Sequence, residues 1–460
     1  MIELLPKLDE HKKEPLYLQL YTYIRTEIEK GSIQQKEKLP SIRSLSAKLG
    51  ISITTVRTAY DQLLMEVYIL SRDKSGYYVE ETSLLTESNG GKQKQRTQTT
   101  ASLEKQTAIY DQRCFDFIKW KKCLSSTLTY DTGRLLAEAD FQGEIEFREE
   151  IRKYIFQARG VESDIEDIVI GAGTQQMINI LVTILKKIGK NKIGFENPGY
   201  MLSELIFRNQ DFEAMDLPLD KEGLILDTQA ENLDLLYVSP SHQFPTGIVM
   251  SAGRRTKLLA WAQINQGYII EDDYDSELRY FGKPIPSLKA MDKNDRVIHI
   301  GSFSSTLLPS IRISYLVLPR KLGQIYREIK QSHSQGVSKV DQLTLCKFMK
   351  EGHYQRHIKR IRRLYSEKAA HLSEFLEQNY QDQIKIISNT SGLFIIIEIL
   401  SGGDEQKIAE AFTLEGVKAT AYKNYVKTEY KAKNPRILLY FYNIEEENLQ
   451  KIIHKVLGFS

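Results

Sequence analysis

Apolar side chains in the first eighty residues recur with the spacing of short amphipathic helices. They return every four residues from Leu16 to Ile28, which predicts a helix over 15–30 because side chains four apart share one helix face. A second helix is predicted over 40–50, where Pro-Ser opens the pattern and glycine closes it, and a third begins after Ser52, a favoured N-cap residue.

Two short β-type runs, 68–71 and 76–80, follow the third helix and enclose the polar segment Arg-Asp-Lys-Ser. This arrangement predicts a hairpin. Two helices separated by about three residues and followed by a hairpin are typical of a winged helix-turn-helix. We therefore expect the first domain to span 1–80.

The segment 81–108 is rich in Ser, Thr, Gln, Lys and Glu and contains no aromatic residue, a composition that predicts a flexible linker. From 109 to 460 the sequence alternates helical patterns with short apolar runs. That alternation predicts an α/β fold with helices covering a mostly parallel sheet. We expect a large domain over 109–335, and connecting helices with a small domain over 336–460.

Composition restricts the function only in part. The net charge is +3, but 36–57 holds five basic residues and one acid, a local charge of +4, which favours contact with nucleic acid. No apolar run reaches ~18 residues and no signal peptide is evident, so membrane insertion and export are not expected. Three cysteines without metal-ligand spacing predict a cytoplasmic protein with neither disulfides nor a metal site.

The helix-turn-helix region resembles the winged helix of GntR-family transcriptional regulators. The matching residues are Leu39-Pro40-Ser41, Arg43, Leu45, Ala47, Leu49 and Thr54-Thr55-Val56-Arg57. The resemblance implies binding of double-stranded DNA through Ser41, Arg43, Ser52, Thr54, Thr55, Arg57 and Gly76. Arginine side chains at such positions can reach guanine edges and phosphates. Ile53 and Val67 depart from the family pattern, so operator preference is expected to differ from that of relatives.

Polar residues in the second domain follow predicted strands. Gly171–Gln175 comes after the apolar run Ile168–Ile170, and the strand Tyr268–Asp275 ends in acids. A serine-rich loop with one arginine lies in 301–315. Ligands bind at the carboxyl ends of strands in open α/β sheets, and glycines before a helix present N–H groups to anions.

These segments resemble the cofactor cleft of fold-type I aminotransferases, which bind pyridoxal 5′-phosphate (PLP). The resemblance implies that an acid, here Asp272, pairs with the pyridine nitrogen, and that Tyr200 stacks on the ring. Tyr274 and His242 would approach the ring hydroxyl. The full set of residues expected at the cofactor is Gly173, Thr174, Gln175, Tyr200, His242, Asp272, Tyr274, Ser302, Ser304, Ser305 and Arg312.

One residue of that pattern is missing. The family places a Schiff-base lysine seven residues before the phosphate-binding arginine, and this chain has Ser305 there. Serine has no amine, so the sequence predicts a domain that is not an enzyme and that binds PLP non-covalently. An active aminotransferase is the disfavoured alternative.

The order of winged helix, linker and aminotransferase-like domain resembles the MocR subfamily of GntR regulators, in which subunits form head-to-tail homodimers. Members of the GabR type, which sense a carboxylated amino acid, carry carboxylate-binding arginines that match Leu202 and Asn443 here. Their absence favours a PdxR-type regulator, which senses PLP and controls vitamin B6 biosynthesis. A GabR-like regulator of amine or amino-acid catabolism is the alternative.

Overall fold

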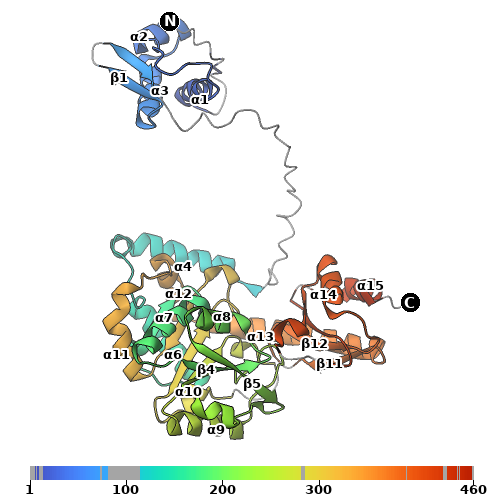
Figure 1. Cartoon of the computed structure of the whole chain (residues 1–460). Coiled ribbons are helices and arrows are strands. Elements are labelled where there is room, and N and C mark those ends of the chain that lie inside the picture. The colour runs from blue at the N-terminus through green and yellow to red at the C-terminus, as the bar shows by residue number, and fades with distance from the viewer. Residues whose placement is uncertain are drawn as a thin grey trace. The chain divides into compact units, whose positions relative to one another are not determined.

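The structure, a computed structural model, describes 14–72, 75–80, 114–280, 285–389, 391–427, 432–442, 444 and 446–457, together with Pro6, Leu8 and Asp9. The chain divides into two compact units, Met1–Leu103 and Glu104–Ser460 (Figure 1). The segment predicted to be a linker, 81–108, lies outside the described residues.

The N-terminal unit contains three helices followed by a two-stranded antiparallel hairpin. They are α1 (Leu16–Glu29), α2 (Ile42–Leu49), α3 (Ile53–Met65), β1 (Ile69–Arg72) and β2 (Gly76–Val79). The predicted caps begin two of the helices: the Ser41 hydroxyl accepts from the backbone N–H of Ser44, and the Ser52 hydroxyl accepts from that of Thr55. Gly50 ends α2 with a φ of 67°, a left-handed conformation that glycine adopts without strain.

The apolar stripes of these helices meet in one core. Leu20 and Ile24 of α1 and Tyr60 and Leu63 of α3 are fully buried there. The Tyr60 hydroxyl donates a 3.0 Å hydrogen bond to the carbonyl of Pro40, which satisfies its polar atom inside the core. The unit is a winged helix-turn-helix, as the sequence predicted.

The C-terminal unit contains a large sheet of eight strands in the order β3-β10-β9-β8-β7-β4-β5-β6. Strands β4, β5, β7, β8 and β9 run parallel, whereas β3, β10 and β6 pair antiparallel with their neighbours. The strands are β3 (Ile168–Gly171), β4 (Lys192–Asn197), β5 (Glu213–Asp220), β6 (Gly223–Leu224), β7 (Leu235–Val238), β8 (Tyr268–Asp273), β9 (Val297–Ser302) and β10 (Ser314–Val317).

Helices cover both faces of this sheet, as Figure 1 shows. The helices before α12 (Lys339–Lys350) are α4 (Phe117–Tyr130), α5 (Thr132–Leu135), α6 (Ile145–Arg159), α7 (Thr174–Lys187), α8 (Met201–Asn209), α9 (Ala252–Ile264), α10 (Leu288–Met291) and α11 (Arg320–Ile329). Of these, α4 packs on α12 and α5 contacts α4, so the others form the layers on the sheet. Alternate side chains of β3 show the two faces: Ile168 and Ile170 pack in one core with α6, and Val169 packs in another with α7 and α11. Because both faces are covered, strands such as β3 and β7 are buried along their whole length and consist almost entirely of apolar residues.

Two long helices lead to a second, smaller sheet. These are α12 (Lys339–Lys350) and α13 (His353–Tyr380). The sheet is antiparallel, with the order β11-β12-β14-β13, and lies at the orange and red end of Figure 1. Its elements are β11 (Ile384–Ser388), β12 (Phe394–Ile399), α14 (Glu405–Leu414), β13 (Ala419–Ala421), β14 (Arg436–Tyr440) and α15 (Glu446–Leu457). Within the described residues, no helix is both long and apolar enough to cross a membrane.

Candidate functional site

A cavity of about 420 Å³ lies at the carboxyl ends of the central parallel strands. Its wall comes from the regions of both sheets of the C-terminal unit, and half of its residues are aromatic. It consists of Thr174, Tyr200, Met201, Leu202, Ser239, Phe244, Asp272, Tyr274, Tyr425 and Tyr440. The volume and the few polar groups among apolar ones are those of a small-molecule site. Four residues predicted to contact a cofactor line this cavity directly: Thr174, Tyr200, Asp272 and Tyr274.

Asp272 is the acidic group of the cavity. It lies near the end of β8 and is only 6% exposed. The hydroxyl of Tyr237 donates a 2.5 Å hydrogen bond to its Oδ2. Burial raises the pKa of Asp272 to about 6, the Tyr237 hydrogen bond lowers it, and the neighbouring Asp273 and Asp275 raise it further. A cation bound in the cavity would stabilise this carboxylate, because an opposite charge within a few ångströms favours the ionised form.

Behind Tyr274, His242 forms a buried hydrogen-bonded chain. Its Nδ1 lies 2.7 Å from Oδ2 of Asp275 and 3.0 Å from the Tyr274 hydroxyl. The imidazole also stacks on Phe394, with ring centroids 5.7 Å apart. His242 lines a neighbouring pocket of about 290 Å³ rather than the aromatic cavity itself. His242 was predicted to approach the ring hydroxyl of the cofactor. In the structure, Tyr274 lies between His242 and the cavity, so His242 holds the Tyr274 side chain in position instead.

The predicted phosphate-binding residues gather at one end of α7. Gly173, with a φ of 81°, precedes the helix, and no side-chain hydrogen bond caps its first turn. A Cβ at Gly173 would lie 2.5 Å from an Nη of Arg312, so the guanidinium fits against this glycine only because it has no side chain. At the paired ends of β9 and β10, the Ser314 hydroxyl donates to Ser302 Oγ at 3.0 Å. Backbone N–H groups at a helix start and a guanidinium are groups that bind phosphate in many proteins.

Three other residues predicted to contact the cofactor, Gln175, Ser304 and Ser305, differ in exposure and in hydrogen-bond partners. Gln175 is exposed on α7, while Ser304 is half-buried, with its backbone N–H donating to Ser302 Oγ at 3.2 Å. The Ser305 hydroxyl donates to the carbonyl oxygen of Tyr274. The side chain at the position of the family's lysine is thus short and already hydrogen-bonded to the backbone beside the cavity.

Neither of the two positions that match the family's carboxylate-binding arginines holds an arginine in this chain. Leu202 lines the wall of the cavity. Asn443 lies outside the described residues. The nearby Arg436 pairs with Glu398 at 3.2 Å and lies over the ring of Tyr422, with Cζ 5.9 Å from the centroid. Neither Leu202 nor Arg436 is therefore available to bind the carboxylate of an amino acid.

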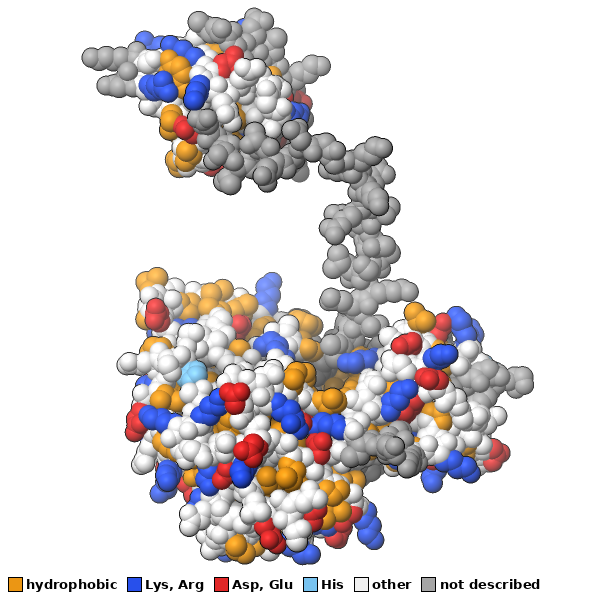
Figure 2. Space-filling model, viewed as in Figure 1, with side chains coloured by type: hydrophobic (Ala, Val, Ile, Leu, Met, Phe, Trp, Pro, Cys, Tyr) orange, Lys and Arg blue, Asp and Glu red, His pale blue; other side chains and the backbone are white. Residues whose placement is uncertain are grey.

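In the N-terminal unit, the predicted DNA-binding residues separate into two groups. Arg43, Thr54 and Arg57 are exposed on α2 and α3, and Figure 2 shows Lys and Arg side chains on the visible face of this unit. Ser41 and Ser52 act as helix caps, and Thr55 Oγ1 lies 2.8 Å from the Ser52 hydroxyl.

Gly76 begins β2 of the hairpin opposite Arg72, with a φ of 108°. Arg72 lies over the ring of Tyr78, with its Cζ 4.7 Å from the centroid. The hairpin therefore carries a cation on the residue paired with Gly76, one of the residues predicted to contact DNA.

Several residues in or beside the cavity escaped the sequence analysis. Tyr237 lies in a strand buried on both faces, where no polar–apolar alternation distinguishes one residue from the next. Tyr425 and Tyr440 come from the region of the small sheet, far along the chain from Asp272. The Arg159 guanidinium, which pairs with Asp273 at 2.7 Å, was missed for the same reason. Only the tertiary fold brings these side chains to the site.

Comparison with known proteins agrees with this arrangement. Residues 16–79 match the gntR family of bacterial regulatory proteins, and 109–437 match aminotransferase class I and II. The chain belongs to the MocR subfamily of GntR-type transcriptional regulators. It is 36% identical over 461 residues to YdeL of Bacillus subtilis, an uncharacterized HTH-type transcriptional regulator, with 99% of each chain covered.

A second relative is the HTH-type pyridoxine biosynthesis transcriptional regulator PdxR of Corynebacterium glutamicum. It is 30% identical over 420 residues, covering 91% of this chain and 90% of PdxR. Among solved structures, the kynurenine aminotransferase of Pyrococcus horikoshii superposes with a TM-score of 0.66 at 24% identity. The match covers 77% of this chain and 90% of the enzyme, and it shows the fold alone. This MocR-subfamily chain therefore joins a DNA-binding winged helix to an aminotransferase fold.

Proposed function

We propose that this regulator binds PLP non-covalently in the cavity lined by Asp272 and that PLP occupancy controls its binding to DNA. The observation that carries the proposal is the buried Asp272 carboxylate, whose pKa burial raises to about 6. A protonated pyridine nitrogen would supply the cation that this carboxylate lacks within the cavity. The backbone N–H groups that follow Gly173 at the start of α7, together with the Arg312 guanidinium beside them, would hold the phosphate. Tyr200 would lie against the pyridine ring.

Ser305 supports regulation rather than catalysis. When bound, PLP supplies an electrophilic aldehyde and a ring that accepts electrons. This chain offers no lysine amine at position 305, and the Ser305 hydroxyl is held by the carbonyl of Tyr274. The residues around the cavity can therefore bind and orient PLP, but position 305 has no amine to move a proton. We propose that the domain is not a transaminase.

Leu202 supports PLP itself as the signal. An amino-acid effector needs a cation for its carboxylate, and Leu202 places an apolar side chain in that wall of the cavity. PdxR, a regulator of pyridoxine biosynthesis, is 30% identical over most of its length. We infer that the target genes here also serve vitamin B6 biosynthesis. PLP would act by binding one state of a homodimer more tightly than another, because only differential affinity can shift such an equilibrium.

An equilibrium titration of the full-length chain with PLP, followed by ligand absorbance and protein fluorescence, tests the proposal. We expect saturation at one PLP per chain. We also expect Asp272→Asn to weaken binding about tenfold or more, because a hydrogen bond to a charged group contributes ~1.5–3 kcal/mol. Asp211→Asn, at an exposed carboxylate, is the matched control. Equal affinity of the two variants would contradict the assignment of Asp272.

A second experiment measures the affinity of the full-length chain for DNA from its own promoter region, with and without saturating PLP. A shift in DNA affinity with PLP, but not with pyridoxine, would support a phosphate-dependent effector. A shift only when an amine is added together with PLP would favour the GabR-like alternative. Conversion of an amino acid by the purified chain would refute the non-enzymatic assignment.

A further inference from the structure

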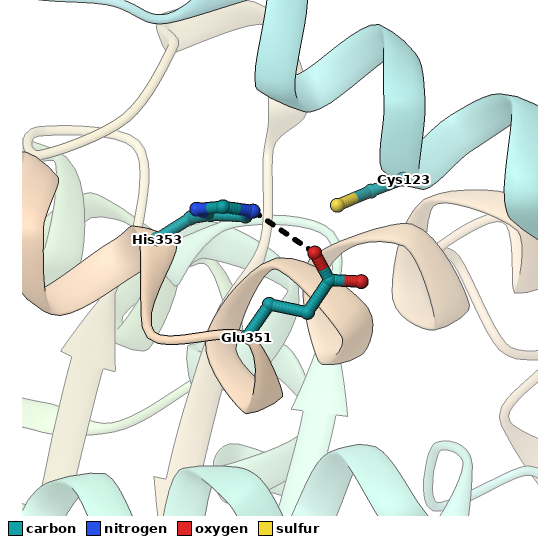
Figure 3. A group of neighbouring side chains, drawn as sticks. All are labelled: Cys123, Glu351 and His353. Carbon is teal, nitrogen blue, oxygen red and sulfur yellow. Dashed lines mark hydrogen bonds and ion pairs between the residues drawn. The ribbon is translucent and has the colours of Figure 1, made fainter.

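Three potential metal ligands from distant parts of the sequence meet on the C-terminal unit, apart from the cavity. They are Cys123 of α4, Glu351 at the end of α12 and His353 at the start of α13 (Figure 3). Their Sγ, carboxylate oxygen and imidazole nitrogen all lie within 4.8 Å of one another. The imidazole Nε2 of His353 is 2.9 Å from Oε2 of Glu351, and the Cys123 sulfur points toward this pair (Figure 3).

The elements around the three residues hold them in place. Helix α4 packs along α12, and Lys347 of α12 pairs with Asp131 at the end of α4 at 2.7 Å. Gly352, with a φ of 70°, makes the turn between α12 and α13 that sets Glu351 and His353 side by side. The backbone thus fixes the distances between the ligand-bearing positions without any metal, as a preorganised site requires.

The combination of donors selects the kind of ion. A thiolate, an imidazole and a carboxylate are the ligands of Zn²⁺, which binds sulfur at ~2.3 Å and nitrogen at ~2.0 Å. Mg²⁺ and Ca²⁺ prefer oxygen donors and would not take the cysteine. Three protein ligands leave one tetrahedral position, which water can fill from the solvent side, where the Glu351 side chain is 46% exposed.

The Cys123 thiol is buried beside the other two donors. It is 1% exposed, and its sulfur lies within 4.8 Å of the Glu351 carboxylate oxygen and the His353 nitrogen. A divalent cation bound between these groups would be neutralised by one thiolate and one carboxylate.

We propose that Cys123, Glu351 and His353 bind one Zn²⁺-type ion per chain. Its bonds would fasten α4 to the α12–α13 junction. Spacing analysis of the sequence predicted no metal site, because the cysteine stands far from its two partners along the chain and only the fold brings them together. The proposal is independent of PLP and of the function of the cavity.

Arg356 forms hydrogen bonds that would compete with metal binding. Its Nη2 donates to His353 Nδ1 at 2.7 Å and to the Glu351 carbonyl at 2.8 Å. A guanidinium only donates, so Nδ1 accepts and Nε2 carries the proton toward Glu351 in this arrangement. A metal needs the Nε2 lone pair, and a bound imidazole donates from its other nitrogen. Arg356 is exposed and must turn away, so Arg356→Gln should strengthen metal binding.

The test is a titration of the untagged full-length chain with Co²⁺, which reports a bound thiolate by a near-ultraviolet charge-transfer band. We expect a band that saturates at one Co²⁺ per chain and disappears when Zn²⁺ is added. Cys123→Ser should abolish it, whereas Cys346→Ser, at another buried cysteine, should keep it. His353→Gln should weaken Co²⁺ binding at least tenfold, whereas His333→Gln should not.

The Arg356→Gln variant adds an independent readout, a several-fold lower Co²⁺ dissociation constant. If Cys123→Ser does not fold, as judged by circular dichroism, Glu351→Gln and His353→Gln carry the test, since these side chains are partly exposed and their packing is little changed. A chain that shows no charge-transfer band overturns the proposal. So does a band that survives in Glu351→Gln and His353→Gln with unchanged affinity.

Discussion

The hydroxyl of Tyr237 on β7 and the carboxylate of Asp272 on β8 share a 2.5 Å hydrogen bond between two neighbouring parallel strands. Both groups are buried. The bond holds one carboxylate oxygen and leaves the rest of the carboxylate toward the cavity that Asp272 lines. It also opposes the effect of burial, because a donor to the carboxylate lowers its pKa.

We predict that Tyr237→Phe weakens PLP binding about tenfold. Without the phenol, Asp272 holds its proton to higher pH and its orientation is less fixed, and a hydrogen bond to a charged group contributes ~1.5–3 kcal/mol. The measurement is the PLP titration at pH 7. Tyr326→Phe is the control, since that buried phenol donates to the Phe141 carbonyl instead. Equal loss in both variants would indicate general destabilisation rather than an effect on Asp272.

Glu196, at the end of β4, gives a prediction for stability against pH. Burial raises its pKa to about 8, although Ser239 N–H and the Gln243 amide donate to Oε2. The folded chain therefore holds a proton that the unfolded chain releases above its ordinary pKa of 4.5. Stability should fall as pH rises from about 4.5 to 8.

We expect Glu196→Gln to remove this dependence. Each pKa unit corresponds to about 1.4 kcal/mol, so the variant should gain up to about 5 kcal/mol relative to the natural chain between pH 4.5 and 8. Thermal unfolding of both proteins at three pH values in that range measures the difference. Glu213→Gln, at an exposed carboxylate, should show no such trend, and a flat difference for Glu196→Gln would contradict the prediction.

On α3, Arg57 is predicted to contact DNA because it is exposed on the helix that follows the Ser52 cap. If it binds a phosphate, Arg57→Ala should weaken DNA binding on all sequences and reduce the salt slope of the affinity by about one. If Arg57 contacts a base, Arg57→Ala should reduce the binding free energy for the operator by ~1–3 kcal/mol and leave the binding free energy for other DNA sequences unchanged. Lys30→Ala, at the exposed end of α1, is the control and should change neither the DNA affinity nor its salt slope. Both substitutions are at exposed positions, so both variants should keep the folded N-terminal unit.

Local signals explain why the winged helix could be predicted closely. Apolar residues four apart, serine caps and Gly50 are short-range features. Helices α1 and α2 begin and end within one or two residues of their predicted bounds, and α3 begins directly after the predicted Ser52 cap. The acids of β8 and the glycines before α7 were also visible, because they interrupt apolar runs. The sequence therefore indicated both the fold class and one wall of the cavity.

The other walls could not be predicted because they depend on long-range packing. Phe244 lies against Tyr425, with ring centroids 4.7 Å apart, and this contact joins the large sheet to the small one. The backbone N–H of Gly199 donates to the carbonyl of Tyr425 at 3.4 Å, and Lys427 pairs with Asp216 at 2.7 Å. No spacing rule connects residues so far apart, so only the folded chain shows the complete wall of the cavity.

The substitution Ser305→Lys tests whether PLP lies in the cavity with its aldehyde toward position 305. The Ser305 hydroxyl touches the Tyr274 carbonyl at the cavity wall, so a lysine there has its amine within reach of a PLP aldehyde in the cavity. We expect a new absorption band from covalent attachment, a mass increase after borohydride reduction, and PLP affinity at least about tenfold higher, equivalent to ~1.4 kcal/mol. Ser310→Lys, at an exposed position of the same loop, should show none of these changes. If Ser305→Lys binds PLP no better than Ser310→Lys and gains no band, the cavity does not hold PLP with its aldehyde toward position 305, and the orientation set by Asp272 and Arg312 must be rejected.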